Sequence, residues 1–301
     1  MIEFCGIELA HRVINGSGTF DAIAARRAFG DALLDDFPFA AYVSKTVTLA
    51  PRQGNPPPRL WELPGGMINS IGLPNKGVER YLAEDLPALA ALPVPLIVNV
   101  MGSSPAEVAQ LVEAFAERDE VSAIELNVSC PNVKTGLVMG ADPGELAGLM
   151  DAVRPRTTKP LIVKLTPNCT SPADVAAAAE GHGADAVSLV NTLRGMAMHP
   201  SRPGPWLGAG TGGVSGPAIR AIALSQVSVV RARTTLPIVG MGGVQSARHA
   251  HDLREAGADL VAIGTESFRD PLAGTAIAAG LAAMEDGLPA NAATAGAVTH
   301  R

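Results

Sequence analysis

The sequence predicts an α/β protein with a single (β/α)8 barrel. Eight short apolar runs have the length of β-strands, Ala-rich segments of helical period separate most of them, and the chain has 301 residues. Barrels of this class use about 250 residues for eight strand and helix units, so these observations favour a closed barrel. An open, doubly wound sheet of eight strands remains the alternative fold.

The eight apolar runs extend through most of the chain. Several follow a turn signal and precede a helical segment, and two follow a Gly that would end a helix. This rhythm predicts parallel strands joined by helices. In chain order the runs are "VINGSG" from residue 13, "AAYVSKTVT" from 40, "PLIVNVMG" from 95, "AIELNVSC" from 123, "PLIVKLTPN" from 160, "GADAVSLVNT" from 183, "LPIVGMGG" from 236 and "GADLVAIGT" from 257.

Two insertions and the C-terminal segment depart from this rhythm. Residues 50–76 are rich in Pro and Gly, and residues 193–214 are rich in Gly. Long connections in a compact domain are usually lids or binding loops, so we expect both insertions to be loops. Residues 286–301 lack an apolar period and are expected to form a loose tail of one domain, residues 1–301.

The charge pattern argues against several classes of partner. The formal net charge of -6 comes from interspersed acidic and basic residues, which disfavours nucleic acid or an anionic membrane as the main partner. No stretch approaches the roughly 20 apolar residues that span a bilayer, and no basic segment precedes an apolar signal core. The sequence predicts a cytoplasmic protein.

The cysteine and histidine patterns indicate no metal centre. Cys5, Cys130 and Cys169 are far apart and form no C-x-x-C pair, which is typical of reduced thiols. Three thiols are too few for a four-cysteine iron-sulfur cluster. His249 and His251 point to different faces of a predicted helix, so we expect no metal ligands there.

One glycine pattern, at Gly208, Gly210 and Gly213, fits G-x-G-x-x-G. In a dinucleotide site this pattern follows a strand, and an acidic residue about 20 positions later holds the ribose. Neither feature occurs here, so a dinucleotide site is rejected. We expect a loop, with Ser215 capping the following helix.

Polar residues interrupt the apolar runs near their ends. In a barrel these late strand positions form the C-terminal face, where the catalytic groups of such enzymes lie. A single buried Asn is more often a core amide with satisfied hydrogen bonds, but five polar groups at one strand depth favour a functional site. The five are Lys45, Asn99, Asn127, Lys164 and Asn191.

The two lysines of this set are informative because the chain has only five Lys. A buried ammonium is costly unless an anionic group meets it. One interpretation pairs a lysine with a buried carboxylate such as Glu125. The other places Lys45 and Lys164 against an electron-rich cofactor or substrate, and both interpretations remain open.

Glycines end the last two predicted strands. Gly240, Gly242 and Gly243 close one run, and Gly264 and Thr265 close the next. Glycine there exposes backbone N–H groups at the start of a helix, which is how a barrel holds a phosphate after strands seven and eight. Two consecutive examples indicate a phosphate site.

Cys130 is the remaining chemical group at this face. A cysteine near a strand end is usually a small inert hydrophobe. Here it follows a strand on the polar face, and Pro131 is expected to stiffen its loop. A thiol on a loop can cover a bound ligand and act as a base if its pKa is suitable.

A series of motifs now resembles the dihydroorotate dehydrogenase family over nearly the whole chain. They occur in the family's order: "SGTF", "SKTVT", "GNPPPRLWE", "NSIGLPNKG", "ELNVSCPNVK", "VKLTPN", "NTLRGMA", "GTGGVSGPAI", "GMGGV" and "IGT". The resemblance implies a (β/α)8 barrel with FMN at its C-terminal face. It also implies oxidation of (S)-dihydroorotate to orotate in pyrimidine biosynthesis.

The resemblance implies roles for individual residues. Those around the isoalloxazine and ribityl chain would be Ser17, Lys45, Thr46, Asn99, Asn127, Lys164 and Val190, with Gly216, Gly242, Gly243, Gly264 and Thr265 toward the ribityl end and phosphate. Those that hold the substrate would be Lys45, Asn69, Ser70, Ile71, Gly72, Leu73, Asn127, Asn132, Asn191 and Thr192. Cys130 would remove the C5 proton while the C6 hydride passes to flavin N5, and Lys45 and Lys164 would stabilise charge on the reduced flavin.

The electron acceptor is a separate question. Cysteine at position 130, rather than the serine of the quinone-using class, is similar to the soluble class. The motifs "GNPPPR", "NVSCPNVK" and "NTLRGMA" resemble the NAD-linked catalytic subunit, which we prefer, whereas "NSIGLPN" is closer to the fumarate-using branch. The NAD-linked branch implies a partner subunit with FAD and a [2Fe-2S] cluster and two copies of each subunit; the fumarate branch implies a homodimer.

Two other functions remain as alternatives. A related flavin barrel could act on another pyrimidine, as the dihydropyrimidine dehydrogenases do, because similar Asn groups would bind its substrate. A barrel without a cofactor could serve as a binding module. Binding tests with uracil and with dihydroorotate would distinguish the first alternative. Uptake of FMN would exclude the second.

Overall fold

The computed structural model describes residues 1–129 and 139–287. Cys130 and Asn132 therefore lie outside the described residues, as do residues 288–301 of the expected tail.

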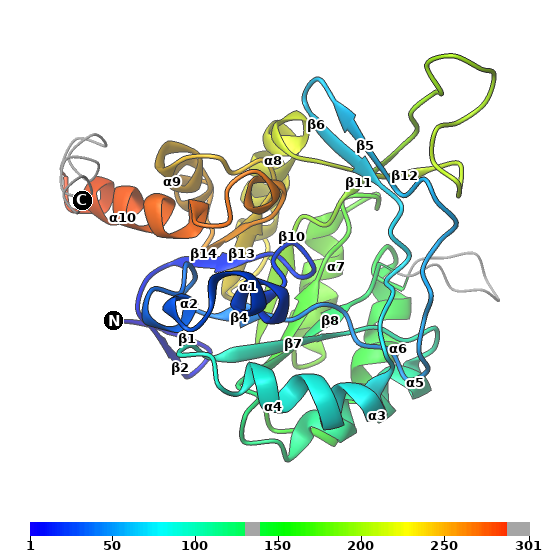
Figure 1. Ribbon diagram of the computed structural model, residues 1–301. Coiled ribbons are helices and arrows are strands. Elements are labelled where there is room, and N and C mark those ends of the chain that lie inside the picture. The colour runs from blue at the N-terminus through cyan, green and yellow to red at the C-terminus, as the bar shows by residue number, and fades with distance from the viewer. Residues whose placement is uncertain (130–138, 288–301) are drawn as a thin grey trace.

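Eight parallel strands form one sheet, and each predicted apolar run supplies one of them. They are β3 (Val13–Asn15), β4 (Tyr42–Val43), β7 (Leu96–Val100), β8 (Ala123–Asn127), β9 (Leu161–Lys164), β10 (Ala186–Leu189), β13 (Ile238–Met241) and β14 (Leu260–Ile263). Their order is β3-β14-β13-β10-β9-β8-β7-β4, which follows the chain around a ring. Figure 1 shows these strands at the centre of the molecule.

The two end strands of that order, β3 and β4, meet through a side chain. The Asn15 amide donates a hydrogen bond to the Val43 carbonyl and accepts one from the Val43 N–H, each at 2.8 Å. The Ala40 N–H also donates to the Val13 carbonyl at 2.9 Å. These bonds pair backbone groups that an open sheet edge would leave exposed. The barrel prediction is confirmed, and the open-sheet alternative is wrong.

Helices surround the barrel. Their bounds are α1 (Ala22–Phe29), α2 (Ala32–Asp35), α3 (Val78–Arg80), the π-helical turn η1 (Tyr81–Asp85), α4 (Leu86–Leu89), α5 (Pro105–Ala116), α6 (Pro143–Val153), the 3-10 turn η2 (Arg154–Arg156), α7 (Pro172–Gly181), α8 (Arg220–Arg231), α9 (Ala247–Glu255) and α10 (Ala273–Glu285). Ser104, Asp142 and Ser171 cap the starts of α5, α6 and α7, and a Pro follows each cap, which favours a helix start there. Within the described residues, no helix has the length and apolar character needed to cross a membrane.

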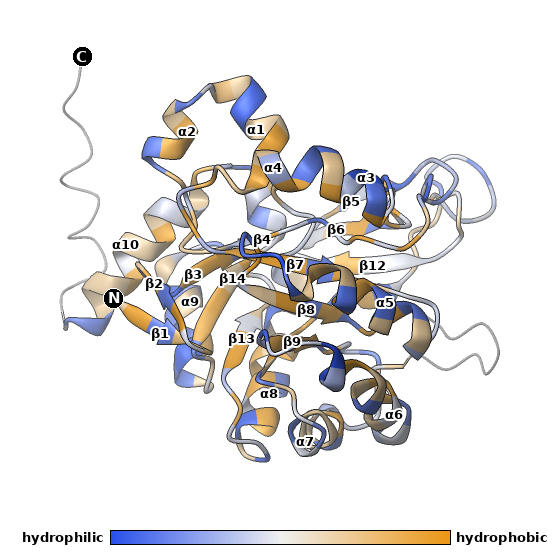
Figure 2. Cartoon of the chain, turned by 90° about the horizontal axis from the view of Figure 1, so that it is seen from below, coloured by the Kyte–Doolittle hydropathy of each residue, from blue (hydrophilic) through white to orange (hydrophobic). Residues whose placement is uncertain are grey.

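Strand alternation divides the apolar core in two, because successive strand residues point to opposite faces. One large cluster joins strands to helices, whereas residues such as Ile97, Ala123, Ile162 and Ala186 pack with other strand residues inside the barrel. Figure 2 shows the hydrophobic strands surrounded by helices of mixed hydropathy. A hairpin of β1 (Ile2–Phe4) and β2 (Ile7–Leu9) adds Phe4 and Leu9 to the inner cluster and so covers the N-terminal end.

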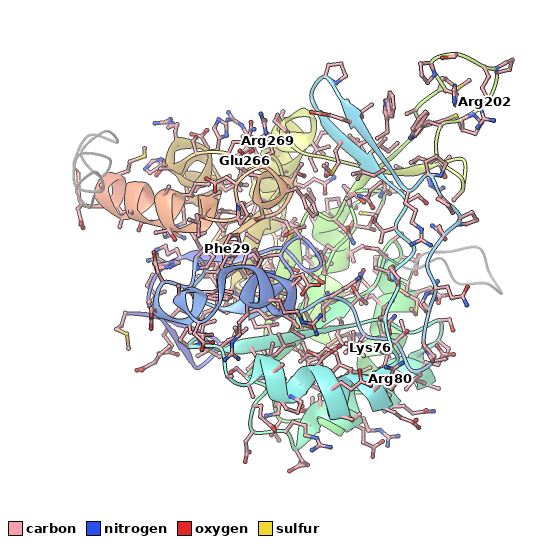
Figure 3. All side chains as sticks on the ribbon, viewed as in Figure 1. Phe29, Lys76, Arg80, Arg202, Glu266 and Arg269 are labelled. Atoms are coloured by element: carbon pink, nitrogen blue, oxygen red, sulfur yellow. The ribbon has the colours of Figure 1, made fainter. Side chains whose placement is uncertain are left out.

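The two insertions form an antiparallel sheet, so the prediction that both are loops is wrong. Its strands are β5 (Leu60–Leu63), β6 (Gly66–Asn69), β11 (Leu193–Gly195) and β12 (Gly212–Ser215), in the order β11-β12-β6-β5. The sheet projects beyond the barrel in Figure 1, and Figure 3 places Arg202 in the outer part of the second insertion. Strands of four residues or fewer show almost no local period, and β6 pairs with the distant, Gly-rich β12, which is why the sequence did not reveal this sheet.

The prediction that Ser215 caps the following helix is also wrong. Ser215 is the last residue of β12, and Gly216 instead precedes the 3-10 turn η3 (Pro217–Ile219) without any side-chain cap. Gly213 of the rejected glycine pattern pairs with Asn69 in this sheet. Gly213 of this pattern therefore serves close strand pairing, whereas Gly208 and Gly210 lie before β12.

Candidate active site

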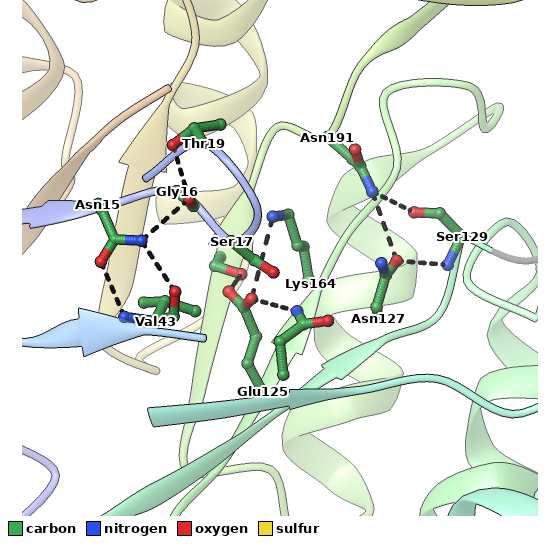
Figure 4. A network of polar contacts seen from close by, with 12 residues as sticks. Asn15, Gly16, Ser17, Thr19, Val43, Glu125, Asn127, Ser129, Lys164 and Asn191 are labelled. Atoms are coloured by element: carbon green, nitrogen blue, oxygen red, sulfur yellow. Dashed lines mark hydrogen bonds and ion pairs between the residues drawn. The ribbon is translucent and has the colours of Figure 1, made fainter. Parts of the chain in front are cut away.

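Four polar side chains form a layer inside the barrel. Alternation along β7, β8, β9 and β10 places them two residues beyond the inner apolar positions, at Asn99, Glu125, Lys164 and Ser188. All four are buried. We call these four residues the polar layer, and Figure 4 shows Glu125 and Lys164 facing each other within it.

Glu125 is the centre of the polar layer. Its Oε1 accepts a hydrogen bond from Ser188 Oγ at 2.7 Å, and its Oε2 accepts one from Asn99 Nδ2 at 2.5 Å. The Lys164 Nζ lies 3.9 Å from Oε2. The carboxylate partner considered for a buried lysine is therefore present, and the remaining Lys164 donors are not committed to it.

Asn99 and Lys45 differ in their surroundings, since Asn99 is buried and Lys45 is exposed. Within the described residues, the buried Asn99 Oδ1 has no hydrogen-bond partner, which is costly in a protein interior. Lys45 is exposed, so its expected place inside a buried strand is wrong. The reason is that β4 ends at Val43 and pairing with β7 resumes only at Val47, so Lys45 lies in an interruption of the strand.

An amide cluster lies beyond the ends of β8 and β10. Asn191 Nδ2 donates to Ser129 Oγ at 2.9 Å and lies 3.4 Å from Asn127 Oδ1. The Ser129 N–H also faces Asn127 Oδ1 at 3.4 Å (Figure 4). Asn191 accepts a bond from the Thr192 N–H at 2.8 Å. These contacts bring two predicted substrate residues, Asn127 and Asn191, together although Asn191 lies past its strand.

The second sheet joins two further predicted substrate residues. Asn69 Nδ2 donates to the Gly213 carbonyl at 3.4 Å. Thr192 packs closely on Gly213, because a Cβ added to Gly213 would lie 2.0 Å from the Oγ1 of Thr192. Asn69 and Thr192, which are far apart in sequence, therefore contact one residue of β12.

The segment that follows Asn69 is fixed by the first insertion. Asn55 Nδ2 donates to Ser70 Oγ at 2.8 Å, and the Asn55 N–H donates to the Ile71 carbonyl at 3.1 Å. Gly72 has φ of +75°, and a Cβ there would lie 2.4 Å from the Asn55 N, so this position requires glycine. Leu73 follows with φ of 54°. Asn55 was missed by the sequence analysis, and no local pattern indicates its role.

Across the barrel from the amide cluster, glycines from the connections after β12, β13 and β14 lie close together. A Cβ added to Gly216 would lie 3.5 Å from Thr265 Cγ2, and one added to Gly243 would lie 3.0 Å from the Gly216 carbonyl oxygen. We call Gly216, Gly243 and Thr265 the glycine cradle. Gly242 packs on Val190, with 3.3 Å between its added Cβ and Val190 Cγ2. The predicted phosphate residues therefore lie together, with Gly264 beside Thr265 at the end of β14.

Two other predicted flavin residues, Ser17 and Thr46, lie in the connections after β3 and β4. Ser17 Oγ donates to the Ser44 carbonyl at 2.7 Å, which links the connections after β3 and β4. Thr46 is buried next to Lys45. Ser188 of the polar layer was missed, although its spacing from Ala186 in "AVSL" places it on the inner face.

The two described thiols, Cys5 and Cys169, have raised pKa values that do not suit a catalytic base. Burial, together with the nearby Asp185 charge, raises the pKa of Cys5 to about 12. Burial also raises the pKa of Cys169. Neither thiol is ionised near neutral pH. Within the described residues, no cluster of His, Cys, Asp and Glu could hold a metal ion.

Comparisons with known proteins agree with this arrangement. A family model described as dihydroorotate dehydrogenase matches residues 1–284. A protein of Geotalea daltonii named "Dihydroorotate dehydrogenase B (NAD(+)), catalytic subunit" is 44% identical over 93% of this chain and 91% of its own length. Proteins with the same name from Pelobacter propionicus and Desulforudis audaxviator are 45% and 43% identical, each over 93% of this chain and 91% and 90% of their own lengths. Matches of this extent and identity show that the chain belongs to the dihydroorotate dehydrogenase family.

Proposed function

We propose that this enzyme oxidises (S)-dihydroorotate to orotate with bound FMN and passes the electrons to NAD through a partner subunit. The observation that supports this function best is the meeting of three features at one end of the barrel. The amide cluster of Asn127, Ser129 and Asn191 lies beyond the polar layer, and the glycine cradle lies across from both.

The residues present fit FMN. The Asn99 Oδ1, which has no hydrogen-bond partner among the described residues, suits the imide N–H of a flavin ring. The glycine cradle suits a phosphate, because Gly216 and Gly243 have no Cβ atoms and so allow close approach to backbone N–H groups. In this proposal Ser17, Thr46, Asn127 and Val190 contact the ring and ribityl chain together with the two lysines. Gly216, Gly242, Gly243, Gly264 and Thr265 hold the phosphate end.

The residues also fit a pyrimidine that carries a carboxylate. Amide side chains can each donate and accept, so Asn69, Asn127 and Asn191 match the ring amides of dihydroorotate. Backbone and side-chain groups of residues 70–73, with Asn132 and Thr192, complete the pocket in this proposal. The exposed Lys45 ammonium offers a charge for the substrate carboxylate.

Cys130 is proposed as the base that removes the C5 proton. It directly follows Ser129, whose hydroxyl is bound by Asn191, so the chain approaches Cys130 from the amide cluster. FMN, when bound, supplies the acceptor for the hydride that leaves C6. Lys164 and Lys45 favour negative charge on the flavin, and the amides orient the substrate for both transfers.

The names of the relatives support NAD as the proposed electron acceptor. Those described above are named as NAD(+) catalytic subunits. We propose that a partner subunit carries FAD and a [2Fe-2S] cluster, because the chain has only three Cys. Two copies of each subunit would assemble. The fumarate-using homodimer is the alternative, and the "NSIGLPN" motif is the feature that favours it.

An anaerobic half-reaction experiment tests the function. The purified protein is expected to show a flavin spectrum that bleaches with dihydroorotate but not with dihydrouracil. Recovery is then followed with fumarate, with NAD alone and with NAD plus the partner subunit. Recovery only in the last case supports the NAD-linked function, and recovery with fumarate supports the homodimer. A flavin spectrum that dihydroorotate leaves unchanged would contradict the proposal.

A further inference from the structure

We propose that Glu125 is a positioning residue, which fixes the amide of Asn99 and balances the charge of Lys164 beneath the flavin. The inference rests on the proposed function, because Asn99 and Lys164 must face FMN for Glu125 to act on it. Glu125 itself reaches the site only through these two side chains.

The first argument is that Glu125 is fully engaged by neighbours on three strands. Its side chain comes from β8, whereas Asn99 comes from β7, Lys164 from β9 and Ser188 from β10. Glu125 is only 3% exposed. A buried carboxylate with two hydrogen bonds and one ammonium nearby is held in a single orientation. A carboxylate that served packing alone would not need such partners, since an apolar residue costs less in a core.

The second argument concerns the direction of the Asn99 amide. A carboxylate only accepts hydrogen bonds, so Asn99 must turn its Nδ2 toward Glu125. Its Oδ1 then points away, and it has no partner among the described residues. Glu125 therefore determines that Asn99 presents an acceptor to a ligand. Without the carboxylate, both ends of the amide become equally available.

The third argument concerns charge. Lys164 lies 3.9 Å from the Glu125 carboxylate, too far for a strong hydrogen bond but close enough to balance its charge in a buried site. Lys164 is only 6% exposed. No other described residue takes a hydrogen bond from Lys164, so its donors can face the ligand while the pair stays electrically neutral. Removal of the Glu125 charge leaves a net positive charge, which favours the more negative, reduced flavin.

The flavin midpoint potential of the holoenzyme tests this. Glu125→Gln removes the charge with little change of shape. We expect the ratio of reduced to oxidised flavin at a fixed potential to rise at least tenfold, which is about 30 mV for a two-electron couple. Glu79→Gln is the matched control, because it makes the same change of charge at an exposed side chain on α3, outside the polar layer. Its potential should equal that of the unmodified protein.

Three further variants keep the test decisive. Glu125→Asp retains the charge and should restore the potential, which a loss of packing alone would not explain.

The pairing is tested independently of flavin by urea unfolding of the full chain with Glu125→Gln, Lys164→Met and both changes. The double variant should unfold at a higher urea concentration than either single variant, because each single change leaves one unpaired buried charge.

The outcomes separate this inference from the proposed function. An unchanged potential in Glu125→Gln, or an equal shift in Glu79→Gln, would overturn the positioning role. Additive losses in the unfolding cycle would overturn the pairing. Failure of dihydroorotate to bleach the flavin would instead overturn the proposed function, and the unfolding cycle would still report on Glu125.

Discussion

The two sides of the barrel contribute to the site in different ways. The side formed by β7, β8, β9 and β10 presents buried polar side chains, Asn99, Glu125, Lys164 and Ser188. The side formed by β13, β14 and the connection before α8 presents Gly216, Gly242, Gly243 and Gly264, so its surface is mainly backbone. The difference teaches that the groups suited to chemistry and the groups suited to anchoring are separated. Changes on the first side should alter rate and potential, and changes on the second should alter cofactor affinity.

The largest effect is expected on the polar side. Cys130→Ser replaces the proposed base with a much weaker acid, so turnover with dihydroorotate at neutral pH should fall about 100-fold or more. FMN affinity should stay the same, since the glycine cradle is untouched. Cys169→Ser is the control, because the Cys169 thiol lies outside the site and donates to the Thr166 carbonyl. Undiminished turnover in Cys130→Ser would rule out the base.

The next largest effect is expected on stability, at the seam where the Asn15 side chain joins β3 to β4. Asn15→Ala leaves the N–H and C=O of Val43 without partners in a buried place, so the free energy of unfolding should fall by about 2 kcal/mol or more. Urea unfolding measures this. Ser103→Ala, which loses an exposed hydrogen bond to Glu107, should change stability far less. Equal losses in the two variants would mean that the seam needs no Asn15 amide.

A smaller effect should follow from the amide cluster. Asn191→Ala removes the donor to Ser129 Oγ and a group proposed to bind the pyrimidine. Orotate should bind about tenfold more weakly, which corresponds to about 1.4 kcal/mol. Spectral titration of the bound flavin with orotate gives this affinity, and FMN retention in the same samples is the internal control. A loss of FMN instead of orotate affinity would contradict the separation of the two sides.

The smallest effect is expected on the glycine side. Gly243 has φ of +71°, and a Cβ there would lie 2.7 Å from Arg220 Cβ. Gly243→Ala should therefore weaken FMN binding about fivefold, or about 1 kcal/mol, while turnover per bound flavin is retained. Gly148→Ala on α6 is the control, because nothing lies within 4 Å of its added Cβ and alanine favours a helix. Equal FMN affinity in both variants would show that the cradle does not hold the phosphate.

The barrel was predictable because its signals are local. Each strand is a short apolar run, and alternation within "AIELN" places Glu125 and Asn127 on one face. The second sheet was not predictable, because β6 and β12 pair across more than one hundred residues and β12 is half glycine. Lys45 was misplaced because the run from residue 40 does not show that its strand ends at Val43.

The site residues divide in the same way. Strand positions such as Asn99, Asn127 and Lys164 could be found from their depth in the apolar runs. The contacts of Asn69 and Thr192 with Gly213 depend on the pairing of the two insertions, so no pattern in either segment reveals them. The family resemblance indicated these residues, and the second sheet gives the physical reason why they meet.

The hairpin of β1 and β2 has one more consequence. Phe4 and Leu9 fill the N-terminal end of the barrel with apolar side chains, so a molecule that approaches the polar layer from solvent must use the opposite end. Substrate arrival, product departure and electron exchange would then share one face. A partner subunit that docks there must leave a passage for dihydroorotate and orotate, or it must attach beside that face and receive electrons across the protein wall.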